Sequence, residues 1–93
     1  MDLNIKVVFS DMIFAQEVDG EMVLLDMESE NYFGLDAVGT DIWREVEQHN
    51  GDLSKVYTAL LAMYDVEEER LQNDLLTFVK KLEESGLVKV EKA

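Results

Sequence analysis

Few side chains in this 93-residue sequence have the chemistry that catalysis needs. His49 is the only histidine and there is no cysteine, so no nucleophile–base constellation can be assembled around a recognisable motif. His49 lies in "EQHNGD", at a predicted helix end where an imidazole interacts favourably with the helix dipole. We therefore expect a structural position for His49 and no catalytic activity of the chain's own.

Metal and phosphate sites are not indicated either. A zinc site needs several His or Cys ligands, and the carboxylates do not follow the EF-hand pattern of calcium loops. The glycines stand singly at predicted turns and helix ends, so no GxGxxG phosphate loop exists. The acidic run Glu67–Glu69 is more typical of a solvated helix start than of a ligand set. We expect no metal and no cofactor.

The charge of the chain restricts its partners. Its 21 acidic and 8 basic residues give a formal net charge of -13, which repels nucleic-acid phosphates and anionic membranes. A neutral or basic partner such as a peptide is favoured instead. No apolar run approaches the roughly 18 residues of a membrane span, and the N-terminus does not resemble a signal peptide. The sequence predicts one cytoplasmic domain over residues 1–93.

A three-stranded antiparallel meander is predicted between Met12 and Leu35. The apolar runs "MIFAQEV" and "EMVLLD" flank Asp19-Gly20, a dipeptide that favours a tight hairpin turn. The polar segment "MESEN" then leads into "YFGL", a short third strand. The preceding "IKVVF" fits either a short strand or an ordered arm, and both interpretations stay open.

Three helices are predicted after the meander. Asp36 and Asp52 are N-caps whose carboxylates can accept free amides of a first helical turn, and Gly86 is a stop signal for the third helix. "LVKVE" could add a short terminal strand. Strands followed by helices indicate an α+β fold with the helices on one side of a small sheet. The apolar residues that recur at helical spacing are Val38, Ile42, Trp43 and Val46, then Val56, Tyr57, Leu60, Leu61 and Tyr64, and finally Leu71, Leu75, Phe78, Val79 and Leu82.

The third strand could bind a peptide. If Asn31–Leu35 lies at a sheet edge, its free backbone groups can pair with an added strand, and Gly34 would not obstruct a close approach. Tyr32 and Phe33 point to opposite faces, so one can pack inward while the other meets a ligand. The alternative is that both aromatics belong to the core. The apolar stripe of the third helix could likewise contact a groove or be wholly buried.

The segments "EMVLLDMESENYFGLDAVGTDIWREVE" and "YDVEEERLQNDLLTFVKKLEESGLV" resemble the PqqD family. That family has a strand, a turn, "YFGLN", a "VG…IW" helix, an acidic helix start and a "GLV"-like close. Asp36 stands where asparagine is usual, and both residues cap helices. The similarity covers about residues 12–90. The matching residues are Tyr32, Phe33, Gly34, Leu35, Val38, Gly39, Ile42, Trp43, Val66, Leu75, Leu82, Gly86 and Leu87.

The resemblance implies a winged-helix-like fold, with a three-stranded antiparallel sheet followed by three helices. It also implies recognition of the leader region of a ribosomally made precursor peptide, in the biosynthesis of pyrroloquinoline quinone, a lasso peptide or a radical-SAM-modified peptide. The implied partners are that leader and a modifying enzyme, either a radical-SAM enzyme or a leader protease with a cyclase. The leader would add as a strand to the third strand and lie beside the third helix.

The resemblance implies a set of peptide-binding residues. The backbone of the third strand would pair with the leader, and the third helix would supply groove side chains. One residue of the second strand would lie at the floor of the groove. Asp74 would either pair with a basic leader residue or face water. These positions are Asn31, Tyr32, Phe33 and Gly34, then Leu71, Asp74, Leu75 and Phe78, and Leu25 for the floor.

Two other classes of function are alternatives. One is a non-catalytic acidic adaptor for another protein partner. The other is a winged-helix DNA-binding protein, which the charge disfavours because the third helix has only Arg70, Lys80 and Lys81 as cations.

Overall fold

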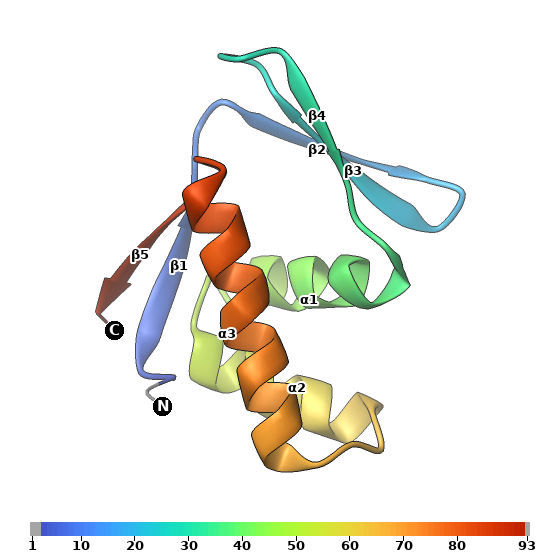
Figure 1. Ribbon diagram of the computed structural model, residues 1–93, viewed down its shortest axis with the longest axis vertical. Coiled ribbons are helices and arrows are strands. Elements are labelled where there is room, and N and C mark those ends of the chain that lie inside the picture. Colours follow the sequence, from blue (N-terminus) through green and yellow to red (C-terminus); the bar gives the residue numbers. More distant parts are fainter. Residues whose placement is uncertain (1–2, 93) are drawn as a thin grey trace.

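A computed structural model describes residues 3–92 of the chain, with a three-stranded sheet above three helices and a two-stranded ribbon at one side (Figure 1). In chain order the elements are β1 (Ile5–Phe9), β2 (Ile13–Val18), β3 (Glu21–Asp26), β4 (Asn31–Gly34), α1 (Ala37–Gln48), α2 (Leu53–Met63), α3 (Glu68–Glu84) and β5 (Val88–Lys92).

The predicted meander is confirmed as the antiparallel sheet β2-β3-β4. Asp19 and Gly20 turn β2 into β3 with φ of 53° and 83°, the left-handed conformation that an Asp-Gly hairpin uses. Asp26 organises the next turn, because its carboxylate accepts hydrogen bonds from the Glu28 amide at 3.0 Å and the Ser29 hydroxyl at 2.9 Å.

The terminal strand that "LVKVE" allowed is present as β5. β5 follows α3 and pairs antiparallel with β1, so the two ends of the described chain meet in a second sheet. The segment "IKVVF" is therefore a strand. Its Val7 amide donates to the Gly51 carbonyl at 2.8 Å, which ties β1 to the turn between α1 and α2. Short local patterns cannot reveal such a pairing, since the two strands are separated by almost the whole chain.

Caps explain where the helices begin. Asp36 accepts a hydrogen bond from the Gly39 amide at 2.7 Å, and Asp52 accepts one from the Lys55 amide at 3.4 Å, as the sequence predicts. Before α3, Glu67 makes no side-chain cap bond. Acidic residues in the first turn of α3 instead suit the positive end of the helix dipole.

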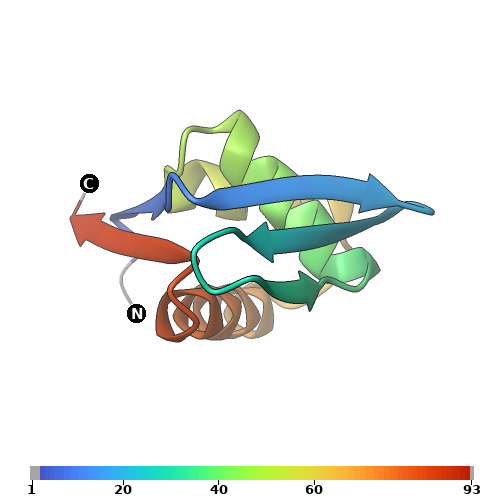
Figure 2. The same cartoon turned by 90° about the horizontal axis from the view of Figure 1, so that it is seen from above.

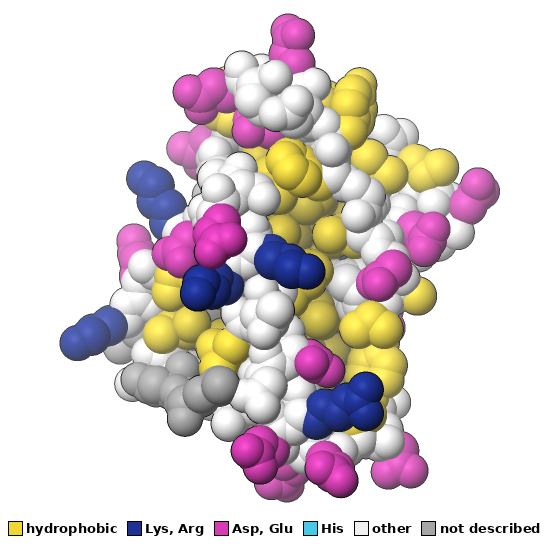
Figure 3. Space-filling model, viewed as in Figure 1, with side chains coloured by type: hydrophobic (Ala, Val, Ile, Leu, Met, Phe, Trp, Pro, Cys, Tyr) yellow, Lys and Arg dark blue, Asp and Glu magenta, His cyan; other side chains and the backbone are white. Residues whose placement is uncertain are grey.

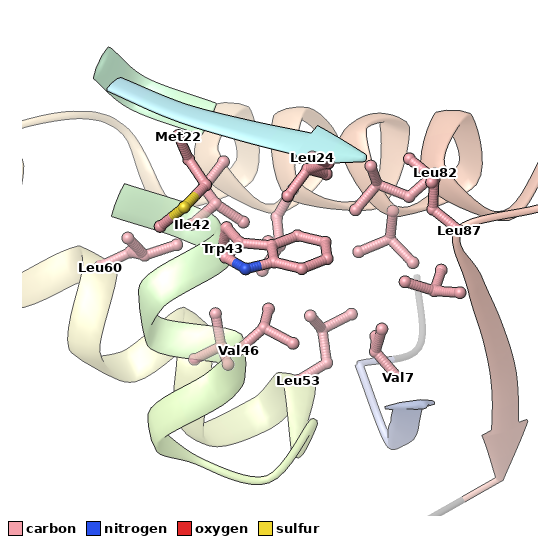
Figure 4. Packing of buried hydrophobic residues seen from close by; sticks show 14 of the residues in the cluster. Val7, Met22, Leu24, Ile42, Trp43, Val46, Leu53, Leu60, Leu82 and Leu87 are labelled. Carbon is pink, nitrogen blue, oxygen red and sulfur yellow. The ribbon is translucent and has the colours of Figure 1, made fainter. Parts of the chain in front are cut away.

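The core lies between the sheet and the three helices (Figure 4). Leu24 on the inner face of β3 is fully buried, as are Leu53 and Leu60. Trp43 of α1 is 2% exposed and stacks on Phe9 with ring centroids 4.4 Å apart, so β1 contributes directly to the core. This packing fixes α1 beneath the sheet and therefore fixes the position of β4.

Candidate functional site

β4 is an edge strand. It pairs with β3 on one side, and no described strand pairs with its other side. The Leu35 amide donates to the Met22 carbonyl at 2.8 Å, and backbone groups in an antiparallel ladder alternate in direction. The Phe33 amide therefore faces β3, whereas the amides of Tyr32 and Gly34 face outward. Two backbone donors and the carbonyls beside them are available for an added strand.

A buried hydroxyl holds the end of this edge in place. Thr40 of α1 is 1% exposed, and its Oγ1 accepts a hydrogen bond from the Met22 amide at 2.8 Å. The same hydroxyl lies 3.5 Å from the Leu35 carbonyl, to which it can donate. One side chain thus bridges β3, the end of β4 and α1, so the edge is positioned by the helix that follows it.

A groove runs beside the edge, between α1 and α3. Its upper part is a cavity of about 500 Å³ next to β4, and its lower part is a more enclosed cavity of about 240 Å³ near the loop between α2 and α3. Val38, Ile42 and Asp74 line both cavities, so the two adjoin, and together we call them the α1–α3 groove. Figure 3 shows apolar side chains along this hollow, with charged groups on its rims. The remaining lining residues are Gly34, Leu35, Asp36, Gly39, Thr77, Phe78 and Lys81 above, and Leu60, Tyr64, Val66, Arg70 and Leu71 below.

Gly39 sets the width of the groove. A Cβ atom at this position would lie 3.1 Å from Phe78 Cε2 and 3.2 Å from the Asp36 carboxylate that caps α1. Both contacts are tighter than ordinary van der Waals packing, so a side chain would push α1 away from α3 or displace the Phe78 ring. The absence of a side chain lets Phe78 stay half-buried against α1 while it still lines the groove.

At the lower end of the α1–α3 groove, a tyrosine is hydrogen-bonded to a carboxylate. The Tyr64 hydroxyl donates a hydrogen bond to Asp41 and so joins the end of α2 to α1. This bond raises the pKa of Tyr64 to about 12, and burial and the negative charges of Asp41 and Asp36 act in the same direction. Tyr64 therefore stays neutral at physiological pH and presents an apolar ring to the enclosed cavity.

Six of the predicted binding residues lie in the α1–α3 groove or on the two faces of β4. Gly34, Asp74 and Phe78 line the upper cavity, and Leu71 lines the lower one while only 8% exposed. Tyr32 is 72% exposed on the outer face of the sheet, and Phe33 is half-buried on the inner face, as their alternation predicts.

The other three predicted residues lie away from the groove. Asn31 is exposed at the start of β4. Leu75 is completely buried in the core behind the groove. Leu25 pairs with Tyr32 across the ladder, so it shares the outer face rather than the groove side.

Some groove residues were not predicted. Val38 belongs to the predicted apolar repeat of its helix, and the structure places it 51% exposed at the groove. Thr77 and Lys81 are absent from the predicted binding residues, although they follow Asp74 at positions i+3 and i+7 and therefore share its helix face. That spacing could have revealed them. The contribution of Tyr64 had no such signal, because it depends on how α2 packs against α1.

The structure contains little that suggests other chemistry. His49 is the C-cap of α1, and its Nε2 lies 3.2 Å from Glu45 Oε2. Among residues 3–92 no group of three or more His, Cys, Asp or Glu side chains is arranged to hold a metal ion. No helix in the same range has the length and apolar content to cross a membrane.

The part of the chain that contains both the β4 edge and the α1–α3 groove matches a known protein family. The sequence profile of the family described as "Coenzyme PQQ synthesis protein D (PqqD)" matches residues 21–88, which contain β3, β4 and all three helices. The chain belongs to the PqqD family. No curated protein sequence matches the chain significantly.

Two solved structures resemble the chain over most of its length. TbiB1 in complex with the TbiA(beta) leader peptide is 33% identical, with a TM-score of 0.82 over 88% of this chain and 94% of TbiB1. Lasso peptide synthetase B1 complexed with its leader peptide is 25% identical, with a TM-score of 0.80 over 90% of this chain and 98% of the other. Both neighbours hold leader peptides. The likeness confirms the predicted three-stranded sheet with three helices.

Proposed function

We propose that this PqqD-family chain recognises the leader region of a ribosomally made precursor peptide and presents the precursor to a modifying enzyme. The observation that carries the proposal is the unpaired edge of β4 beside the α1–α3 groove. An extended peptide that adds to this edge gains backbone hydrogen bonds, and its alternate side chains enter the groove. The two similar structures bound to leader peptides support a lasso-type precursor as the first candidate.

The two features have different tasks. Backbone pairing to Tyr32 and Gly34 is independent of leader sequence, so it supplies affinity. Phe78, Val38 and Ile42 offer an apolar surface, so the groove selects leaders with large apolar side chains at alternate positions. Asp74 on the rim favours a basic leader residue nearby.

The chain acts as a non-catalytic element in this proposal, and the chemistry belongs to its partner enzyme. A radical-SAM enzyme, or a leader protease with a cyclase, fits the class of precursor. Such a role places the chain in the cytoplasm, where precursors are synthesised. If His49 serves only as a helix cap, His49→Ala should leave product formation in a reconstituted pathway nearly unchanged. A hundredfold loss in a folded variant would contradict the non-catalytic role.

A non-catalytic adaptor for a folded protein is the second candidate, supported by the strongly acidic surface. DNA binding is disfavoured by the same charge, and no affinity for duplex DNA is expected at physiological salt.

The direct test is calorimetric titration with a synthetic leader from the precursor encoded beside this chain's gene. A scrambled peptide of the same composition is the control, because it keeps the charge and removes the order of apolar residues. The proposal predicts saturable binding of the leader alone. Equal binding of both peptides, or no binding of either, would contradict it.

A further inference from the structure

The outer face of the three-stranded sheet carries large apolar side chains that nothing in residues 3–92 covers. Phe14 is 56% exposed, Val18 49% and Tyr32 72%. The strand register pairs Phe14 with Leu25 and Leu25 with Tyr32, so an apolar row crosses all three strands. Figure 2 looks onto this side of the sheet, with the helices behind it. We call this surface the outer sheet face.

Such a face is unusual for a small antiparallel sheet. Sheets of this kind commonly bury one face and leave a polar face in water. Here the inner face holds the fully buried Leu24, while the outer face is also apolar, with Val23 and Leu25 half-buried. Apolar side chains on both faces are typical of a sheet that is covered on both sides. The outer sheet face is therefore suited to a second protein surface.

Charge narrows the choice of that protein. Residues 7–43 span the whole sheet and α1 up to Trp43, and they contain nine aspartates and glutamates but no lysine, arginine or histidine. Asp19, Glu21, Glu28 and Glu30 are exposed around the apolar row. A second copy of the chain would bring like charges together, whereas a partner with an apolar patch and a basic rim would be complementary.

The position of the face relative to β4 adds a further constraint. Tyr32 and Gly34 lie on the outer sheet face and also carry the outward amides of β4. A leader strand added to this edge would become the fourth strand, and every second leader side chain would extend the same face. A protein seated there would contact the apolar row and the bound leader at once.

We propose that the outer sheet face is the docking surface for the enzyme that modifies the precursor, through an apolar patch with a basic rim on that enzyme. The inference rests on the proposed leader recognition and adds where the enzyme binds. Because the leader completes the surface, the enzyme binds the leader-loaded chain more tightly than the free chain. By linkage, the enzyme strengthens leader binding by the same factor.

Phe14 gives the sharpest test because it lies on β2, two strands away from the leader edge. Phe14→Gln removes the exposed ring without a charge change. Met63→Gln is the matched control, since Met63 is 51% exposed at the end of α2, outside the sheet. The probes are the synthetic leader and the purified modifying enzyme encoded beside the precursor. Leader affinity is measured by calorimetry, and enzyme affinity by biolayer interferometry with and without leader.

The expected result is at least a tenfold loss of enzyme affinity in Phe14→Gln, with leader affinity within twofold of the parent. Met63→Gln should change neither, and the enzyme should bind the parent less tightly at high salt. Circular dichroism confirms folding, and Val18→Gln is a second variant on the same face.

Several results would overturn the docking surface. One such result is that folded Phe14→Gln and Val18→Gln bind the enzyme as tightly as the parent does. Another is that the enzyme has no affinity for the parent. A parent dimer that Phe14→Gln dissociates would assign the face to self-association. Failure of leader recognition is separately visible, because the parent itself would then not bind the leader.

Discussion

Removing one outward amide of β4 should weaken leader binding without unfolding the chain. Gly34→Pro is the most informative change, because proline lacks the N–H and a β-region backbone tolerates its ring at an edge. The Gly34 amide has no partner in the sheet, so the β3–β4 ladder stays intact. Gly34→Ala is the matched control: it keeps the donor, and its Cβ atom would meet nothing within 4 Å.

The size of the effect follows from the lost hydrogen bond. A leader carbonyl left buried without a donor costs about 1 to 3 kcal/mol. At 25 °C this corresponds to an increase in Kd of about 5-fold to 150-fold. The proline ring also occupies space on the outward side of the strand, which favours the upper part of this range. Gly34→Ala should stay within about threefold of the parent.

Position 33 provides the opposite case. The Phe33 amide faces β3, so Phe33→Pro removes a bond inside the sheet and should lower the free energy of unfolding itself. Calorimetry with the leader gives the affinities, and circular dichroism with urea titration gives the stabilities. The reasoning is refuted if folded Gly34→Pro binds the leader as tightly as Gly34→Ala does.

Three further changes test the groove and the fold. Phe78→Asp places a charge in the apolar groove, and the cost of desolvating the carboxylate should weaken leader binding at least tenfold in calorimetry. If the folded variant binds the leader as tightly as the parent, the leader does not bind in this groove. Gly51→Ala should lower the free energy of unfolding by at least about 2 kcal/mol, because φ at this position is +83° and a Cβ atom would lie 1.9 Å from the Val7 carbonyl oxygen. A urea unfolding midpoint equal to that of the parent would refute this clash. Because the pKa of Tyr64 is raised, its hydrogen bond to Asp41 contributes stability below pH 10, and this contribution is lost as pH rises from 10 to about 12. In Asp41→Asn the pKa of Tyr64, followed by tyrosine absorbance, should return towards its ordinary value of 10.0. An unchanged pKa would exclude the Asp41 carboxylate as the cause.

Local signals predicted the elements that carry the candidate site. Asp-Gly at a hairpin and aspartates before apolar helical repeats act over a few residues, so their effects are readable without the fold. Asp36 illustrates this: its carboxylate caps α1 as predicted, and this fixes where β4 must end. The family resemblance then added a prediction that the pattern left open, namely that the third strand binds a partner.

Long-range packing could not be read in the same way. Pairing of β1 with β5 joins segments from opposite ends of the chain, and only the assembled core brings them together. Leu75 and Phe78 show the same limit on a single helix. Both belong to one apolar stripe, yet Leu75 is fully buried while Phe78 is half-buried and lines the groove. Periodicity predicts the stripe but not the boundary between core and groove.

Amide hydrogen exchange, read by NMR on the free and leader-bound chain, tests strand addition most directly. The outward amides of Tyr32 and Gly34 are unpaired in the sheet, so they should exchange fast in the free chain and slow down at least tenfold at saturating leader. The Phe33 amide already bonds to β3 and should change little. Saturation by the leader with no added protection at Tyr32 and Gly34 would contradict the proposal that the leader joins the sheet at β4.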